Sequence, residues 1–206
     1  MKFVQKYSIP YPDWHPKANR ISLIPDPYEK MHPHLMNENF PIVGVSWDSA
    51  LTFCKILSAM EGNNYNLPSE AEWEYACRAG TTRKRYGQLD EIAWWGGNSN
   101  GRPHLVGLKK PNKWGIYDML GNVGEYCLDH YYRNYDNAPN DGEAWIDQSH
   151  KKKKRVVRAS SFNLIKSLIT AYQRGRILPT KEGYRGIGFR IVMRKKKSIM
   201  EKKIVR

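Results

Sequence analysis

Two carboxylates in the stretch G-I-Y-D-M-L-G-N-V-G-E-Y, residues 115–126, constrain this chain more than any other feature. Asp118 and Glu125 flank Gly121 and Asn122, where the chain can reverse and turn both side chains and the intervening carbonyls inward. Such an oxygen shell suits a hard cation such as Ca²⁺. The spacing alone leaves a second interpretation open, in which Asp118 caps a turn and Glu125 pairs with a basic residue.

Length and composition favour a single globular domain. The 206 residues suffice for one ordinary core, and the 40% hydrophobic and 12% aromatic content argues against disorder. No apolar run approaches the length of a membrane span, and the N-terminus lacks the hydrophobic core of a signal peptide. We therefore expect a cytoplasmic or a virus- or particle-associated protein. The three cysteines, odd in number and without close spacing, do not suggest a disulfide framework.

Two short segments carry most of the formal net charge of +14. The run Lys151–Arg155 contributes +5 and the tail 194–206 contributes +6, which leaves the rest of the chain close to neutral. Clustered lysine and arginine residues predict nucleic-acid binding. Like-charge runs are also common in solvated loops and frayed termini, and no nucleic-acid motif accompanies these two. Both interpretations stay open.

Local signals predict two helices and two strands. Ser46 is a typical N-cap, Gly62 is a typical C-terminal cap, and apolar residues recur between them at helical spacing. A second helix is expected from Ser69, where a glutamate three residues later completes a capping box. Beyond these helices we expect mainly loops over a small sheet, with strands at Val156–Phe162 and Ile187–Val192.

Six sequence blocks, in order, resemble the formylglycine-generating enzyme (sulfatase-modifying factor) family. The blocks are P-I-V-G-V-S-W-D-S-A at 41–50, L-P-S-E-A-E-W-E-Y-A at 67–76, H-L-V-G-L-K-K-P-N at 104–112, the stretch at 115–126, R-V-V-R-A-S-S-F at 155–162 and G-F-R-I-V at 188–192. The resemblance covers residues 41–193. It implies an α+β, C-type-lectin-like fold, with two helices packed on a small twisted antiparallel sheet and much irregular loop. We therefore expect one domain over 1–193 and a basic tail over 194–206.

The resemblance also shows which chemistry is missing. Enzymes of this family oxidise a cysteine in sulfatases, using a copper ion held by two cysteines, and a thiolate pair is the natural ligand set for Cu(I). Matching R-A-S-S-F to the family's R-G-G-S-W places those two positions at Leu164 and Ile169. The cysteines of this chain, Cys54, Cys77 and Cys127, lie elsewhere. We therefore expect no copper and no sulfatase-activating reaction.

The family's calcium site implies a role for the acidic motif. By resemblance, side-chain oxygens come from Asp118 and Glu125, and main-chain carbonyl oxygens come from Gly121 and Val123. Asp118 stands where the family has asparagine, and aspartate is an equally hard donor. Gly124 replaces a packing tryptophan, which we expect to loosen the loop and weaken the site. The resemblance thus predicts Ca²⁺ binding by these four ligands.

The segment 159–187, between the R-A-S-S-F and G-F-R motifs, departs from the mostly polar pattern of the family. Proteins with this fold also serve as variable proteins of diversity-generating retroelements, in which scattered positions before G-F-R are mutated while the frame stays fixed. A buried strand and turn filled with aliphatic residues is the alternative. Exposed side chains here would form an apolar patch typical of protein binding. The candidate contact residues are Phe162, Leu164, Ile165, Leu168, Ile169, Tyr172, Tyr184 and Arg185.

These features predict a non-catalytic domain that binds a protein or another macromolecular ligand, and a candidate variable protein diversified by a retroelement. Two alternatives stay open. One is an enzyme of altered chemistry in the same family, which rests on fold-level analogy. The other is a nucleic-acid-associated protein that uses Lys151–Arg155 and the tail.

Overall fold

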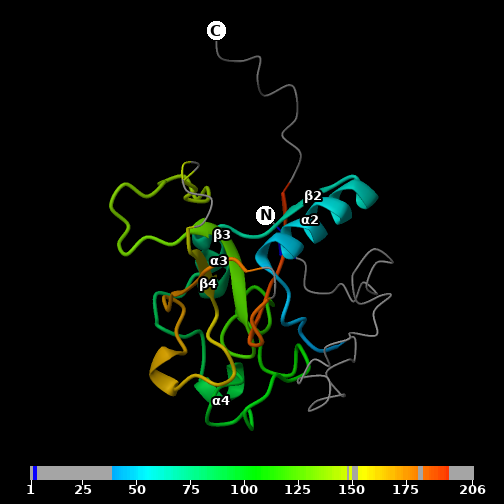
Figure 1. Ribbon diagram of the computed structural model, residues 1–206. Coiled ribbons are helices and arrows are strands. Elements are labelled where there is room, and N and C mark those ends of the chain that lie inside the picture. Colours follow the sequence, from blue (N-terminus) through cyan, green and yellow to red (C-terminus); the bar gives the residue numbers. More distant parts are fainter. Residues whose placement is uncertain (1, 4–38, 148, 150–152, 181–182, 195–206) are drawn as a thin grey trace.

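The computed structural model describes residues 2–3, 39–147, 149, 153–180 and 183–194 (Figure 1). Most of the first forty residues, Lys151, Lys152 and the tail beyond Arg194 lie outside the described residues. The elements in order are β1 (Lys2–Phe3), α2 (Trp47–Glu61), β2 (Asn64–Asn66), α3 (Glu70–Arg78), α4 (Leu89–Ile92), β3 (Gly124–His130), β4 (Arg155–Arg158), the 3-10 turn η2 (Lys166–Leu168), β5 (Gly175–Ile177), β6 (Ile187–Gly188) and β7 (Val192–Arg194). Within this part of the chain, no helix is long and apolar enough to cross a membrane.

Both predicted helices form with the predicted caps. α2 begins after Ser46, whose hydroxyl accepts a hydrogen bond from the Ser49 N–H at 3.1 Å, and it ends at Gly62 in the left-handed conformation (φ 69°). α3 begins with the complete capping box of Ser69 and Glu72. These contacts satisfy main-chain groups that lack an intrahelical partner. The caps therefore fix where each helix starts and which of its residues face the core.

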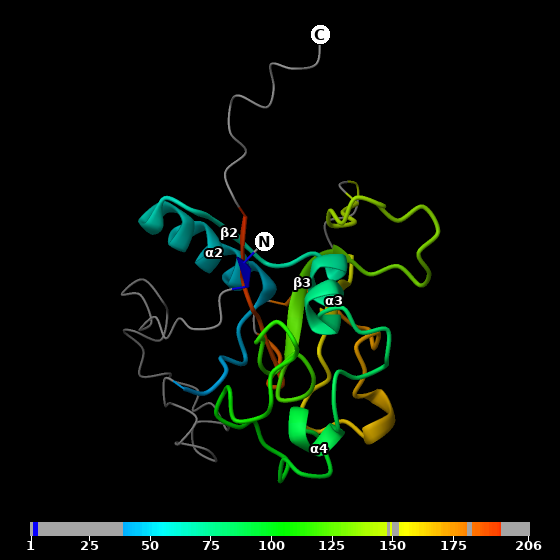
Figure 2. The same cartoon turned by 180° about the vertical axis from the view of Figure 1, so that it is seen from behind.

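Two small sheets form the centre of the molecule (Figures 1 and 2). The first has the strand order β1-β7-β2, and both of its pairs are antiparallel. The second has the order β5-β4-β3-β6, in which β3 pairs antiparallel with β4 and parallel with β6. α2 packs beside β2, and α3 packs against β3 and β4. The α+β architecture predicted from the sequence is confirmed, with two sheets rather than one.

Both predicted strands are shorter than expected. The first was predicted to reach Phe162 but ends at Arg158, because Ala159 adopts the left-handed conformation (φ 52°) and turns the chain out of the sheet. The second, predicted over Ile187–Val192, is divided between β6 and β7, which belong to different sheets. Residues 189–191 carry the chain from one sheet to the other, so a single continuous strand cannot form there.

The core has two clusters of buried side chains. The first lies between α3, α4 and the four-stranded sheet and includes Trp73, Met119, Leu120, Cys127, Val156 and Ile169. The second lies under α2 and includes Trp47, Leu57, Tyr65, Leu67, Tyr126 and Val157. Ile169 is 0% exposed, so the segment predicted to bind a ligand also contributes to the core.

Candidate functional site

The segment that follows β4 is anchored through its main chain. The Ser99 hydroxyl donates to the Phe162 carbonyl at 2.8 Å, and the Gly96 N–H donates to the Leu164 carbonyl at 2.9 Å. The Phe162 N–H in turn donates to the Asn122 carbonyl at 2.7 Å. None of these three bonds uses a side chain of the segment itself.

Two arginines anchor the later part of the segment in the same way. Arg85 donates from Nε to the Ile169 carbonyl at 2.7 Å and from Nη2 to the Lys166 carbonyl. Arg158 donates from Nη2 to the Ala171 carbonyl. Because every residue carries a carbonyl oxygen, these bonds form whatever side chains the segment exposes. The surroundings therefore fix part of the segment's path, and its own buried or half-buried side chains fix the rest, among them Arg174, which donates to Glu70.

The predicted contact side chains divide into exposed and buried groups. Ile165 and Tyr172 are 64% and 53% exposed. Phe162 and Ile169 are 7% and 0% exposed, so their assignment as contact residues was wrong: both pack inside the protein. Three other predicted contact residues are half-buried: Leu164, Leu168 and Tyr184. Arg185 is exposed. The segment therefore contains both kinds of position that the sequence left open: some of its apolar side chains are part of the core, and others lie on the surface.

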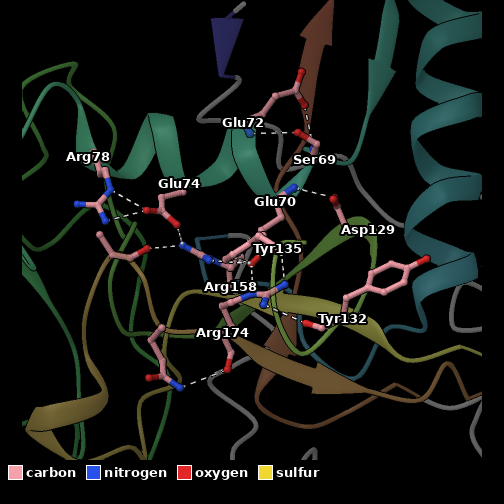
Figure 3. Close-up of polar contacts among 12 residues, drawn as sticks. Ser69, Glu70, Glu72, Glu74, Arg78, Asp129, Tyr132, Tyr135, Arg158 and Arg174 are labelled. Carbon is pink, nitrogen blue, oxygen red and sulfur yellow. Dashed lines mark hydrogen bonds and ion pairs between the residues drawn. The ribbon is translucent and has the colours of Figure 1, made fainter. Parts of the chain in front are cut away.

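A buried ion-pair network lies between α3 and β4 (Figure 3). Arg158, whose side chain is fully buried, lies 2.8 Å from Glu70 and 2.7 Å from Glu74. Arg174 donates to both carboxylate oxygens of Glu70, at 2.6 and 2.7 Å, and the Tyr135 hydroxyl donates to Glu70 at 3.1 Å. Charges this deeply buried are stable only when they are paired and hydrogen-bonded. The network therefore couples the position of α3 to that of the segment.

The carboxylate of Glu125 is committed to an ion pair. Arg190 donates from Nε to Oε2 at 2.6 Å and from Nη2 to Oε1 at 2.7 Å. The indole N–H of Trp73 donates to Oε2 at 2.6 Å, and Glu125 is 5% exposed. A guanidinium and an indole thus satisfy both oxygens. The ion pair that the spacing left open as an alternative to a metal ligand is present.

Asp118, the other predicted calcium side chain, accepts a hydrogen bond from the Gly107 N–H at 2.7 Å. Burial raises the pKa of the Asp118 carboxyl above its ordinary value. Among the described residues, no group of three or more histidine, cysteine, aspartate or glutamate side chains could hold a metal ion. A calcium ion bound by Glu125 would have to displace the Arg190 guanidinium from this carboxylate. Calcium binding stays a prediction.

The Gly121–Asn122 pair has a structural role. A Cβ added at Gly121, which has φ 76°, would lie 2.2 Å from the Trp94 carbonyl oxygen. The Asn122 N–H donates to that same carbonyl at 2.8 Å, and its side chain bonds both main-chain groups of His104, at 3.0 and 3.1 Å. Together with the bond from Phe162, these contacts join the acidic motif to three other loops.

The three cysteines are buried and unsuited to metal or redox chemistry. Burial raises the pKa of Cys54 and Cys77 to about 12 and raises the pKa of Cys127 well above its ordinary value. Burial therefore disfavours the thiolate, which is the form that binds metals. Leu164 and Ile169 occupy the positions matched to the copper cysteines. The residues present do not fit a copper centre.

Three described residues of the basic segments are engaged within the fold, whereas Lys154 is exposed. Lys153 pairs with Asp147 at 3.1 Å, and Arg194 pairs with Glu72 at 2.5 Å. Arg155 is 9% exposed. A phosphate-binding side chain has to reach solvent, so these three residues give the nucleic-acid hypothesis no support.

The buried network was missed by sequence reasoning. Glu70 and Glu74 lie one helical turn apart in one family block, and Arg158 lies in another block. The recurrence of glutamates in one block and of arginines in the other was the available signal. No spacing rule indicates that side chains 88 positions apart would meet.

Comparison with known proteins identifies the scaffold. A family model described as "Sulfatase-modifying factor enzyme 1-like domain" matches residues 13–195. This chain belongs to that family. The formylglycine-generating enzyme of Streptomyces coelicolor is 34% identical to this sulfatase-modifying-factor domain over 114 residues, which cover 47% of the chain and 34% of the enzyme. The alignment thus spans about a third of the length of that relative.

Two solved structures share the fold of this sulfatase-modifying-factor domain. PvdO from Pseudomonas aeruginosa has a TM-score of 0.71 and 30% identity, over 75% of this chain and 62% of PvdO. Treponema denticola variable protein 1 has a TM-score of 0.63 and 26% identity, over 75% of this chain and 71% of that protein. The family and the C-type-lectin-like fold implied by the sequence blocks are therefore confirmed.

Proposed function

We propose that this sulfatase-modifying-factor domain is a non-catalytic binding domain whose contact surface is the exposed face of residues 159–187. One observation carries the proposal: Ser99, Arg85 and Arg158 hold the segment by its carbonyl oxygens. The exposed side chains are not needed for these anchors, so they can serve recognition without disturbing the fold. A rigid frame beneath exposed side chains is the arrangement that a binding surface requires.

The exposed side chains suit a protein ligand. Ile165, Tyr172 and Leu178 are 64%, 53% and 49% exposed, and Arg176 and Arg185 are exposed beside them in the sequence. Tyrosine and arginine are enriched at protein interfaces, and aliphatic groups supply apolar contact area. Exposed Lys166, next to Ile165, is the exception in this set, because lysine is depleted at protein interfaces.

The structural similarity to Treponema denticola variable protein 1 supports the retroelement version of this function. That version predicts a reverse transcriptase gene near the gene for this chain. It also predicts a near-copy of the coding segment for residues 159–187 that differs at adenines. If neither is present, diversification is excluded and a binding domain of fixed sequence is left.

The buried thiols support a non-catalytic role. Leu164 and Ile169 offer no metal ligand or nucleophile, and raised pKa values keep Cys54, Cys77 and Cys127 protonated. The enzymatic alternative is tested by adding copper and following oxidation of a thiol-containing peptide. Turnover that disappears on mutation of any one cysteine would contradict the non-catalytic proposal.

The contact surface is tested by mutation against a matched control. A partner isolated with the wild-type domain is purified, and its Kd is measured for the double variant Ile165→Ser/Tyr172→Ser. Loss of two interface side chains of this kind weakens binding by about tenfold or more. Met60→Ser is the control, because Met60 is an equally apolar side chain, 73% exposed, on α2. Equal affinities for both variants would place the contact surface elsewhere.

A further inference from the structure

A cleft of about 430 Å³ lies between α3 and the loop 135–145, outside the proposed contact surface. Its aromatic lining consists of Tyr75 from α3 and Tyr135 and Trp145 from the loop. Tyr75 and Tyr135 are 63% and 53% exposed, although large aromatic side chains tend to be buried when they serve packing alone. Exposed rings that line one concavity indicate a recognition site.

The start of α3 holds the loop wall of the cleft in place. The Ser69 hydroxyl donates to the Gly142 carbonyl at 2.6 Å. Asp129, which accepts the Glu70 N–H at 2.7 Å, also accepts the Trp145 N–H at 2.9 Å. The cleft is therefore formed before any ligand arrives, which lowers the entropy lost on binding.

The cleft has a local excess of negative charge. Its charged lining comprises one guanidinium and four carboxylates, from Arg78, Glu70, Glu74, Asp129 and Glu143. Glu70 and Glu74 are balanced from the core side by the arginines of the buried network. Neither Asp129 nor Glu143 forms an ion pair with any of the described residues. Asp129 is buried and its two oxygens accept main-chain N–H groups, whereas Glu143 is exposed, so the unpaired negative charge lies at the rim, on Glu143.

From this combination we propose that the α3 cleft binds a lysine or arginine side chain presented by a partner protein. Arg174 already lies 4.2 Å from the Tyr135 ring centroid, and Tyr132 stacks on Trp145. The aliphatic stem would therefore pack against Tyr75, and the cationic head would lie over the Tyr75 ring and near Glu143. A cation within about 6 Å of an aromatic ring centroid is attracted by the ring's quadrupole. Carboxylates beside the rings add to that attraction, whereas an anionic side chain would be repelled by them.

The net positive charge of the protein makes binding of a basic peptide an informative test. With a formal net charge of +14, the protein repels basic peptides at long range. Non-specific attraction therefore cannot produce binding of a basic peptide. Saturable binding of such a peptide has to come from a local acidic site.

The test uses a short fluorescent peptide that contains lysine and arginine, with an acidic peptide of the same length as its control. Fluorescence anisotropy gives Kd for the wild-type protein and for Glu143→Gln and Tyr75→Ala. We expect each variant to bind the basic peptide about two- to fivefold more weakly, as loss of one exposed cationic contact implies. Glu91→Gln is the matched control, because Glu91 is an exposed carboxylate on α4 that pairs with Lys110 at 3.1 Å.

Three outcomes would overturn the proposal: no saturable binding of the basic peptide by the wild-type protein, equal binding of the acidic peptide, or unchanged Kd values for Glu143→Gln and Tyr75→Ala. Both substituted side chains are exposed, so the variants are expected to fold, and circular dichroism checks this. The variant Ile165→Ser/Tyr172→Ser should bind the basic peptide normally. Normal binding by this variant would show that the α3 cleft and the contact surface of residues 159–187 are independent binding sites.

Discussion

The guanidinium of Arg158 lies 2.8 Å from the carboxylate of Glu70, although 88 residues separate them in the chain. Their side chains are 0% and 7% exposed. Since Arg158 also binds the Ala171 carbonyl, one side chain joins α3, β4 and the proposed contact segment. The frame of that segment therefore depends on a buried charge.

Removal of this charge should destabilise the protein strongly. Arg158→Ala removes the fully buried partner of Glu70 and Glu74, which keep only the less buried Arg174 and Arg78. Loss of a buried charge partner costs about 3–5 kcal/mol of the free energy of unfolding. Urea denaturation measures the loss. The control is Arg78→Ala, which removes a partner of Glu74 where both side chains are about a quarter exposed, at 26% and 27%. It should cost about 1 kcal/mol or less, and equal losses would show that the network contributes no more than a surface pair.

Substitution of two isoleucines four positions apart should change the free energy of unfolding by very different amounts. Ile169→Ala opens a cavity in the core and should lower the free energy of unfolding by about 2–5 kcal/mol. Ile165→Ala removes an exposed side chain and should change it by about 0.5 kcal/mol or less. Denaturant unfolding gives the free energy of unfolding of each variant and so shows which of the two side chains belongs to the core. A large loss for Ile165→Ala would mean that the segment is packed more tightly than described.

The three cysteines should be inert in the folded protein. Burial raises the pKa of Cys54 and Cys77 to about 12 and the pKa of Cys127 well above its ordinary value, so the thiolate is scarce at pH 8. A thiol reagent such as Ellman's reagent should therefore react slowly with the native protein. All three thiols should react at once in denaturant. Rapid reaction of one native thiol would reopen the enzymatic alternative.

Asp118→Asn should stabilise the protein at neutral pH and have little effect in acid. Burial raises the pKa of Asp118, so the folded state holds this proton more tightly than the unfolded state does. Stability is then lost as the pH rises from the unfolded pKa of about 3.9 through the higher folded pKa. Asparagine does not titrate, and its oxygen can still accept the Gly107 N–H. Unfolding curves at pH 3 and pH 7 measure the difference, which should appear only at the higher pH.

Calcium binding at Asp118 and Glu125 stays a prediction: the ion has to displace Arg190 from the carboxylate of Glu125 and should then raise the Tm. A ligand that binds only the folded state raises its Tm. Calorimetry in millimolar Ca²⁺ and in chelator compares the two conditions directly. A clear rise in calcium, absent from Glu125→Gln, would mean that the ion displaces Arg190 and that the site implied by the resemblance is functional.

Local sequence signals were sufficient for the two long helices, α2 and α3, and for the family, but not for the short helix α4. The caps at Ser46 and Ser69 are formed by residues at most three positions apart, so a short window of sequence contains the whole interaction. The division of the predicted strand Ile187–Val192 between two sheets depends on distant pairing partners. No local pattern contains that information.

By itself, the sequence determined the α+β scaffold, its two capped helices and the absence of the copper-binding cysteines, because each depends on residue identities within short, ordered motifs. Only the tertiary structure decided that Ile169 is core while Ile165 is surface, that Glu125 pairs with Arg190, and that Arg158 lies between Glu70 and Glu74. The burial of a side chain and the choice of its ion-pair partner depend on which residues, distant in sequence, pack against it and exclude water. A residue's burial and charge partners are properties of the packed chain, and its neighbours in sequence do not specify them.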